Sequence, residues 1–355
     1  MRSSLFTSSS DRLPVRRPWR RVLVFVALTL LVLGAANAAL TWAVWSYKPH
    51  HLVVLEAKRA AVRDGRFATR AGAVPVLFFG NSITLAGLQP QVFDTLSGHA
   101  TDSWNLGLPA LPISAHYYVL RDYLARNPAP GYIVLQLAVD DGNNPYFDNA
   151  CEGAGPLEIL ALACYTPYHR ILLNYFNPRQ RYSDAVNQMA YDAVFARAHL
   201  ADHVAQARRV AAEAIAERGY YLIQAQAYPD GRLPDDFAIH NPEPRPAPTP
   251  DFNVAQDSYV EAFFQLAQAH QFQVLLIEPP VLANTHTARA APAPYYRTLL
   301  DRYPNAHLAP DGWRSRLYEP ALFADPVHLN RAGAAVFTND VYRQFAAVFP
   351  RVVPR

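Results

Sequence analysis

Three segments of the chain hold residues whose types suit nucleophilic catalysis. They are residues 79–84 (FGNSIT), 105–109 (NLGLP) and 325–333 (DPVHLNRAG). A serine hydroxyl becomes a nucleophile when a base removes its proton, and the base needs a third group that fixes its tautomer. The sequence therefore predicts Ser82 as the nucleophile, His328 as the base and Asp325 as the carboxylate that orients the base.

The backbone N–H groups at Ser82 and Gly107 are the candidate donors for an oxyanion, which forms when a nucleophile attacks an ester carbonyl. Glycine at position 107 lets the backbone come close to that oxygen, because glycine has no Cβ. On this interpretation Ser82 Oγ lies within about 2.6–3.5 Å of one His328 ring nitrogen, and Asp325 lies near the other. A buried Ser82, or a His328 turned away from it, would contradict the triad.

The order and contexts of these residues resemble the SGNH (GDSL) hydrolases. The segment Gly-Asn-Ser-Ile-Thr is similar to that family's first block, with Asn81 in place of the aspartate of Gly-Asp-Ser. Gly107 matches the second-block glycine, and Asp325 and His328 match the last-block pair. The resemblance implies a three-layer α/β/α fold with a parallel, flavodoxin-like sheet, and a Ser-His-Asp triad that needs no cofactor and no metal. The implied reaction is hydrolysis or transfer of an ester acyl group.

The resemblance covers about residues 74–345 and breaks at the family's third block, Gly-x-Asn-Asp, whose asparagine donates to the oxyanion. After the third predicted strand the chain reads AVDDGNN from Ala138, which puts Asp140 at the asparagine position. An ionised carboxylate has no proton to donate. Either Asn143 or Asn144 supplies the missing donor, or the oxyanion hole has backbone donors only.

The N-terminal part of the chain predicts a membrane anchor. No residue from Val22 to Tyr47 is charged, and a helix of this length spans roughly 39 Å, more than the ~30 Å of a hydrocarbon core. The arginine-rich tail, residues 1–21, would hold the N-terminus in the cytoplasm and place the rest of the chain in the periplasm or outside the cell. The alternative is a cleaved signal peptide, because Ala36-Asn37-Ala38 is an A-x-A site.

Composition excludes some classes of protein. Apolar residues make up 51% of the chain and charged residues 17%, which is enough for a large core. The tail alone carries a charge of +5 and the whole chain +3, so the remainder sums to −2, unlike a nucleic-acid-binding domain. Two cysteines cannot form a disulfide scaffold or a four-cysteine zinc site. Cys151 and Cys164 are predicted to form one disulfide in an oxidising compartment.

Short apolar runs alternate with helical patterns, which predicts a parallel sheet covered by helices. The expected strands are 74–79, 103–106, 132–139 and 273–277, and the expected helices are 91–96, 113–126 and 330–345. Ligands on such sheets bind at the carboxyl ends of the strands, where the Ser82 and Gly107 segments fall. The expected organisation is a tail (1–21), a membrane helix (22–47), a juxtamembrane segment (48–73, helical over 51–71) and one SGNH-like domain (74–355).

An insertion at about residues 145–255 interrupts the alternation, with a helical stretch over 184–218 and a proline-rich loop over 242–250. It is either a cap that shapes a substrate groove or a surface insertion. His199 and His203 lie four positions apart and are expected on a solvated helix face, since no third metal ligand is evident. Three tyrosine pairs either pack in the core or stack on sugar rings: Tyr117-Tyr118, Tyr220-Tyr221 and Tyr295-Tyr296.

Together these features predict an exported, membrane-anchored serine acyl esterase or O-acyltransferase that acts on a cell-envelope polysaccharide. The anchor makes the chain similar to the envelope-facing SGNH proteins of teichoic-acid D-alanylation and alginate O-acetylation. The implied partners are an acylated glycan or other acyl donor and a membrane-bound O-acyltransferase. The alternative is a non-catalytic scaffold on the same fold that binds a glycan or such an acyltransferase, and the aspartate at position 140 favours this alternative.

Overall fold

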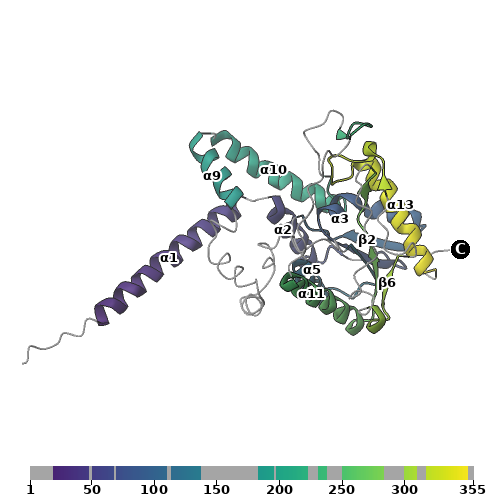
Figure 1. Cartoon of the computed structure of the whole chain (residues 1–355), viewed down its shortest axis with the longest axis horizontal. Helices are drawn as coiled ribbons and strands as arrows, with labels where there is room; N and C mark the ends of the chain where they lie inside the picture. The colour runs from purple at the N-terminus through teal and green to yellow at the C-terminus, as the bar shows by residue number, and fades with distance from the viewer. Residues whose placement is uncertain are drawn as a thin grey trace, which may run out of the picture.

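The computed structural model describes residues 19–47, 50–67, 69–109, 113–136, 183–195, 197–222, 231–237, 250–283, 300–309 and 317–350. A long helix, α1 (Trp19–Tyr47), extends away from an α/β body (Figure 1). Its Trp19–Leu40 stretch is long and apolar enough to cross a membrane, and its apolar side chains are exposed rather than packed against the body. The helix begins three residues before the uncharged run that predicted it.

The body is built on a five-stranded sheet in which every neighbouring pair of strands is parallel. The strands, in spatial order, are β2 (Thr101–Asn105), β1 (Val74–Phe79), β3 (Tyr132–Gln136), β4 (Gln273–Ile277) and β6 (Ala306–Leu308). Strand β1 therefore lies between β2 and β3, so the direction in which strands are added reverses after β2. Ligands on doubly wound sheets bind beside such a reversal, at the carboxyl ends of the strands.

Both faces of the sheet are buried, which explains why β1, β3 and β4 are mainly apolar. Strand β2 at the edge of the sheet is mainly polar. Successive residues of β1 enter two different cores: Val76 and Phe78 pack in one buried cluster, and Leu77 and Phe79 in the other. The predicted parallel sheet is confirmed. The predicted strands 74–79 and 273–277 coincide with β1 and β4, whereas the three-residue β6 was not predicted from its short sequence.

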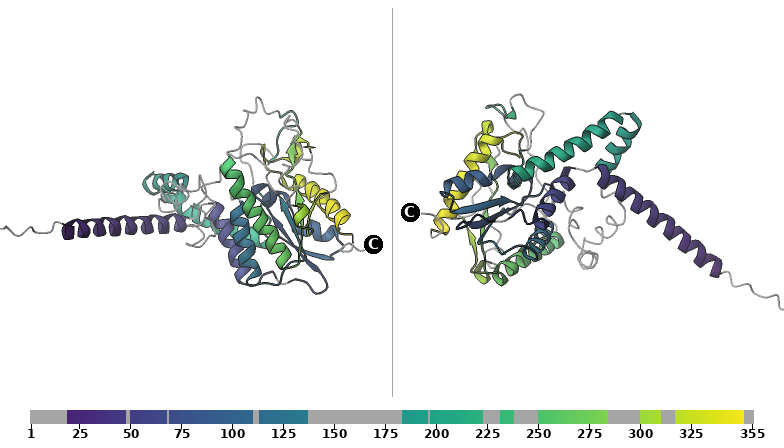
Figure 2. Two further views of the ribbon diagram at one scale, coloured as in Figure 1. Left: turned by 60° about the horizontal axis from the view of Figure 1, so that its bottom comes forward. Right: turned by 180° about the vertical axis from the view of Figure 1, so that it is seen from behind.

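Helices pack against both faces of this sheet (Figures 1 and 2). They are α2 (His50–Arg63), α4 (Pro90–Leu96), α5 (Ile113–Leu124), α11 (Pro250–Ala269) and α13 (Arg331–Val348). The short helix α3 (Ser82–Gly87) follows β1. A short 3₁₀ helix, η3 (Pro320–Leu322), precedes α13, and a two-stranded parallel sheet pairs β5 (Val281–Leu282) with β7 (Leu317–Tyr318).

A helical hairpin, α9 (Ser183–Phe195) and α10 (Arg197–Ala216), projects from the body next to the end of α1 (Figure 1). The sequence predicted one helical stretch over 184–218, and the structure has two helices. The expectation that His203 faces solvent is wrong: its ring stacks on Tyr47 at the end of α1, with ring centroids 4.0 Å apart. The Tyr47 hydroxyl also donates to the Asp192 carboxylate at 3.1 Å.

Ion pairs of Arg218, two residues after the end of α10, connect the hairpin to the sheet. The Arg218 guanidinium donates to Asp94 at 2.9 Å and also to Asp102 in β2. Both carboxylates are nearly buried, and the Arg218 carbonyl accepts from the N–H of Asn105 at 2.9 Å. The turn that follows α10 is therefore bound to the body by ion pairs and a backbone hydrogen bond.

Candidate active site

Ser82, His328 and Asp325 lie in one hydrogen-bonded row, although Ser82 is 246 residues away from His328 in the chain. Ser82 Oγ is 2.9 Å from His328 Nε2, and His328 Nδ1 is 2.8 Å from Asp325 Oδ2. Both distances fall within the range expected from the sequence. The three groups have the relative positions of a nucleophile, a base and an orienting carboxylate.

The segment before α13 holds Asp325 and His328 in a fixed relation. Asp325 Oδ1 accepts from the backbone N–H groups of Val327 and His328, at 2.8 and 2.7 Å. Burial works against ionisation of Asp325, but the His328 ring and the two N–H donors outweigh it and lower the pKa of the carboxyl below its ordinary value. Asp325 is therefore ionised at neutral pH and fixes the Nδ1–H tautomer of His328, which leaves Nε2 free to accept the Ser82 proton.

Ser82 is the first residue of α3, directly after the carboxyl end of β1. The Asn81 side chain caps this helix by accepting from the Ile83 N–H at 2.9 Å. A backbone N–H at the first helical position has no partner within the helix, and no hydrogen bond of the Ser82 N–H is found among the described residues. The turn before it needs glycine, because a Cβ at Gly80 would overlap the Thr84 hydroxyl.

Access to Ser82 is narrow. The residue is 9% exposed, and most of α3 is buried with it. Ser82 is therefore a buried residue, and the expectation that it would not be buried is wrong, although its Oγ still lies within hydrogen-bond distance of His328 Nε2. His328 and Asp325 are more open, with 18% and 24% of their side chains exposed.

Gly107 lies against α3, as the oxyanion-hole hypothesis requires, but its N–H points elsewhere. A Cβ on Gly107 would come within 2.7 Å of the Leu85 backbone nitrogen, so the close approach needs glycine. The Gly107 N–H donates to Asn105 Oδ1 at 2.8 Å. The Asn105 amide in turn donates to the Thr84 and Leu88 carbonyls of α3, each at 2.8 Å. The expected donation from Gly107 to an oxyanion thus differs from the hydrogen bond seen here.

A buried lysine from α2 also reaches this loop. Lys58 in α2 is 1% exposed, and its ammonium group donates to the Gly107 carbonyl. Burial lowers the pKa of Lys58 well below its ordinary value. No carboxylate forms an ion pair with Lys58 within the described ranges, so the Gly107 carbonyl is its partner there.

Several predicted residues lie outside the described part of the chain. These are Asp140, Asn143 and Asn144 of the third block, the cysteines Cys151 and Cys164, and the Tyr295-Tyr296 pair. The structure does describe the end of β3, just before the third block. There Gln136 accepts from the Thr84 hydroxyl at 2.5 Å and links β3 to α3.

Sequence reasoning missed Lys58 and Asn105. The signal for Lys58 is present in the chain: it falls on the apolar stripe of α2, between the buried residues Leu55 and Val62. A lysine on a buried stripe is unusual and points to a specific acceptor. Asn105 gives no such signal, because an asparagine at the end of a strand is common in turns.

Comparison of the chain with models of known protein families and with curated proteins found no match. The chemistry assigned to the site therefore rests on its geometry. Among the described residues, no group of histidine, cysteine, aspartate or glutamate side chains is arranged to hold a metal ion.

Proposed function

We propose that this protein is a serine acyl esterase or O-acyltransferase that acts on a cell-envelope polysaccharide. The observation that carries the proposal is the hydrogen-bonded row from Ser82 through His328 to Asp325, with distances of 2.9 and 2.8 Å. Ser82 and His328 are 246 residues apart in the chain, so local sequence does not account for their alignment. The proposed fold is the three-layer α/β/α arrangement of the SGNH hydrolases, a finer statement than the parallel α/β sheet described above.

In the proposed reaction, Ser82 Oγ attacks the carbonyl carbon of an ester while its proton passes to His328 Nε2. The tetrahedral intermediate collapses, and the alcohol leaves with the proton from His328. A water molecule or a sugar hydroxyl then attacks the acyl-serine, gives its proton to His328, and releases an acid or a new ester. Asp325 stabilises the imidazolium formed in each half of the cycle.

The proposed oxyanion hole begins with the Ser82 N–H at the start of α3. The Gly107 N–H joins it when the donor turns from Asn105 Oδ1 toward the substrate oxygen. Asn143 or Asn144 is the proposed side-chain donor, because the ionised Asp140 carboxylate has no proton to donate. The reaction needs no cofactor or metal, since the serine, base and donors all come from the chain.

The proposed location is the outer face of a cell membrane, with the helix α1 as a single-pass anchor and the N-terminus in the cytoplasm. The length and apolar character of Trp19–Leu40 and the preceding arginines support this placement. A polysaccharide or its acyl donor, and a membrane-bound O-acyltransferase, are the proposed partners.

A second candidate function is a non-catalytic scaffold that binds a glycan or a membrane-bound O-acyltransferase. Two observations favour it: Ser82 is 9% exposed, and the Gly107 N–H is already bonded to Asn105. The complete Ser-His-Asp row favours the enzyme, because a scaffold would gain nothing from a serine held against a base.

Trapping of the acyl-enzyme tests the proposed function against the scaffold. The full-length protein is incubated with p-nitrophenyl acetate, quenched with acid and weighed by mass spectrometry. The enzyme should gain one acetyl group on Ser82, and the Ser82→Ala variant should gain none. An unacetylated wild-type protein, or equal acetylation of both proteins, would favour the scaffold.

A further inference from the structure

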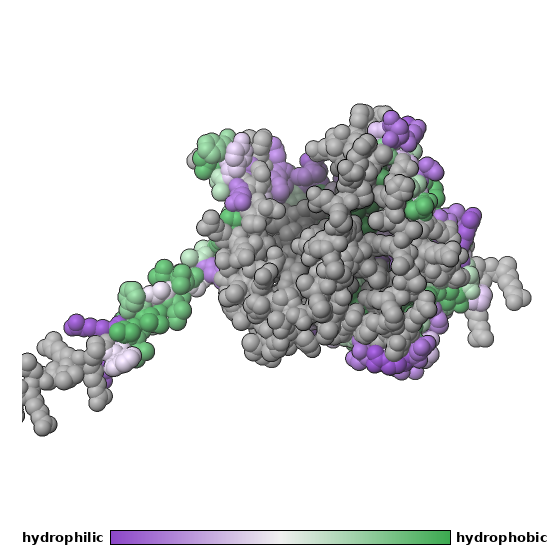
Figure 3. Space-filling view, in the orientation of Figure 1, coloured by the Kyte–Doolittle hydropathy of each residue, from purple (hydrophilic) through white to green (hydrophobic). Residues whose placement is uncertain are grey.

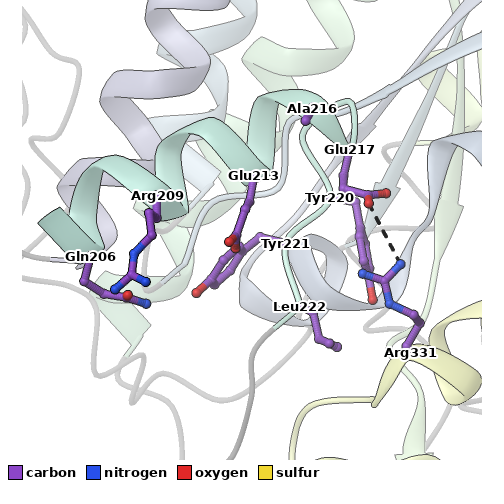
Figure 4. Close-up of a pocket in the computed structure, with 9 residues that line it drawn as sticks. All are labelled: Gln206, Arg209, Glu213, Ala216, Glu217, Tyr220, Tyr221, Leu222 and Arg331. Atoms are coloured by element: carbon purple, nitrogen blue, oxygen red, sulfur yellow. Dashed lines mark ion pairs between the residues drawn. The ribbon is translucent and has the colours of Figure 1, made fainter.

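A pocket of about 340 Å³ lies between the hairpin helix α10 and the body, and most of the side chains that line it are polar or charged (Figure 4). One wall is a single face of α10, where Gln206, Arg209, Glu213 and Glu217 recur at three- to four-residue spacing. The other wall is the turn after α10, together with Arg331. The volume is within the range of pockets that hold small ligands.

This pocket, which we call the α10 pocket, borders both elements that carry the proposed triad. The Tyr221 N–H donates at 3.2 Å to the carbonyl of Leu85 in α3, the helix that begins at Ser82. Arg331 is the first residue of α13 and follows His328 by three positions. A ligand in the α10 pocket is therefore next to the helix of the nucleophile and the segment of the base.

The turn that forms one wall is fixed in place. Gly219 has a positive φ of 88°, and a Cβ there would overlap the carbonyl of Asn105. Tyr220 is buried, and its ring lies under the Arg331 guanidinium, with 5.6 Å between Cζ and the ring centroid. Arg331 is also 4.0 Å from the Glu217 carboxylate (Figure 4). Of the charged side chains in the lining, Arg331 and Glu217 thus contact each other, and Arg331 also contacts the buried ring of Tyr220.

The chemistry of the lining defines the ligand class. Two guanidinium groups, Arg209 and Arg331, face two carboxylates, Glu213 and Glu217, so the charged groups of the lining balance. A phosphorylated ligand would call for an excess of positive charge, and an acyl chain would call for an apolar wall. Carboxylates that accept, guanidinium groups that donate and a tyrosine beside them suit the hydroxyl groups and ring faces of a neutral sugar.

We propose that the α10 pocket binds a neutral sugar unit and holds the glycan whose hydroxyl gives or receives the acyl group at Ser82. This inference rests on the proposed acyl-ester chemistry. It assigns the hairpin α9–α10 the role of a cap, and it gives Tyr221, one of the paired tyrosines, a place beside a sugar ring. Burial, with Glu213 nearby, raises the pKa of Tyr221, so its hydroxyl stays protonated as a donor.

Sugar binding is measured by saturation-transfer NMR on the full-length protein in lipid nanodiscs, since maltoside detergents themselves carry sugars. The probes are cellobiose, maltose and N,N′-diacetylchitobiose. At least one should bind, and Arg331→Gln and Glu217→Gln should each weaken it about tenfold or more, because each removes a charged hydrogen-bonding group. Arg302→Gln is the matched control: Arg302 is similarly exposed and pairs with Glu261 at 2.9 Å.

Lack of binding by all three disaccharides, or equal binding by wild type and Arg331→Gln, would overturn the sugar site. Acetylation of Ser82 is read on the same samples. If Ser82 is acetylated but no disaccharide binds, the α10 pocket is not a sugar site and the proposed function is still supported. Sugar binding without acetylation supports the pocket and removes the esterase. Sugar binding by Ser82→Ala should equal that of wild type.

A different observation concerns the outer face of α9. Tyr191, Val194 and Phe195 share one face of this helix, and Tyr191 and Phe195 are 56% and 76% exposed. Their rings lie 5.4 Å apart. In Figure 3 this face forms an apolar patch near the end of α1. Exposed apolar patches of this kind mark surfaces that contact a partner or a membrane.

The position of the α9 patch identifies its occupant. The hydrogen bond from Tyr47 to Asp192 and the stack of Tyr47 on His203 tie the hairpin to α1, just after the Trp19–Leu40 stretch. Figures 1 and 2 show α9 beside this end of α1. Tyrosine and phenylalanine at that level are typical of helices that rest in the interfacial layer of a bilayer. We infer that Tyr191, Val194 and Phe195 insert into the lipid surface and set the orientation of the body on the membrane.

Fluorescence quenching tests this contact. Phe195→Trp adds an indole at the α9 patch, and Val336→Trp adds one at an exposed apolar position on α13 as the matched control. The full-length variants are compared with wild type in nanodiscs of phosphatidylcholine with or without bromine on the acyl chains. Bromolipid should quench most of the fluorescence added at position 195 and little of that added at position 336. Equal quenching at the two positions would show that α9 does not touch lipid.

Discussion

The Asp325 carboxylate binds His328 twice, through the ring Nδ1 at 2.8 Å and through the backbone N–H at 2.7 Å. One oxygen thus sets the tautomer of the ring, while the other holds the backbone that carries it. This double contact makes Asp325 both an electrostatic partner and a structural support of the base.

Replacing Asp325 by asparagine should separate these two roles. Asp325→Asn keeps an oxygen for the backbone N–H groups but cannot stabilise an imidazolium, so acylation of Ser82 should slow by roughly 10³–10⁴ while the fold persists. Asp235→Asn, at an exposed position, should react like wild type. Acylation rates come from quenched-flow mass spectrometry with p-nitrophenyl acetate. A rate within about threefold of wild type would remove Asp325 from the mechanism.

The buried Lys58 predicts a pH dependence of stability. The pKa of Lys58 is lowered on folding, so the folded state binds fewer protons than the unfolded state between that lowered pKa and the ordinary value of 10.5. The free energy of unfolding should therefore rise with pH in that window, at up to about 1.4 kcal/mol per pH unit. Lys58→Met should lose this rise. The free energy of unfolding of both proteins is measured by chemical denaturation at a series of pH values. If it changes with pH in the same way in wild type and in Lys58→Met, the pKa of Lys58 does not change on folding.

Asp140 is the residue at which the chain departs from the SGNH pattern. If its carboxylate faces the oxyanion, it opposes the developing charge, so small esters should react slowly and Asp140→Asn should react faster. A side-chain donor at this position contributes about 2.7–4 kcal/mol in related sites. If Asp140 instead caps the following turn, Asp140→Asn changes nothing and Asn143→Ala or Asn144→Ala is the damaging change. Initial rates of the three variants decide between the two cases.

The anchor predicts how the protein fractionates. Full-length protein should stay with membranes after a carbonate wash, because a helix such as Trp19–Leu40 is not released by high pH. Protease added from the outer side should digest the chain beyond about residue 50. N-terminal sequencing is the check on cleavage: a mature chain that begins at Ala39 would show that the A-x-A site is used and that α1 is a signal peptide.

The sequence was sufficient to predict the parallel sheet and the alignment of Ser82, His328 and Asp325 in one hydrogen-bonded row, because both leave local signals. Strands β1 and β4 are continuous apolar runs with clear ends, and the segments of Ser82 and His328 are short motifs at a strand end and a helix start. The α10 pocket could not be predicted in this way. Its residues come from a helix face, a turn and Arg331, and only packing brings these three together.

The donors of the oxyanion hole could also be predicted from the sequence only in part. A glycine at position 107 predicted a close backbone approach to a substrate oxygen, whereas the close approach in the structure is to the Leu85 backbone of α3. The direction of the Gly107 N–H depends on Asn105 and on Lys58 from another helix. No local pattern encodes such a network of long-range hydrogen bonds.

Labelling with a fluorophosphonate probe shows whether Ser82 is an activated nucleophile, because the phosphorus reacts readily with a serine that a nearby base activates. The wild-type protein should take up one phosphonyl group, and tandem mass spectrometry should locate it on Ser82. His328→Ala should label at least about a hundredfold more slowly, and Ser82→Ala should not label. A folded wild-type protein that stays unlabelled while a control serine esterase is fully labelled, or that is labelled at another residue, would contradict the account.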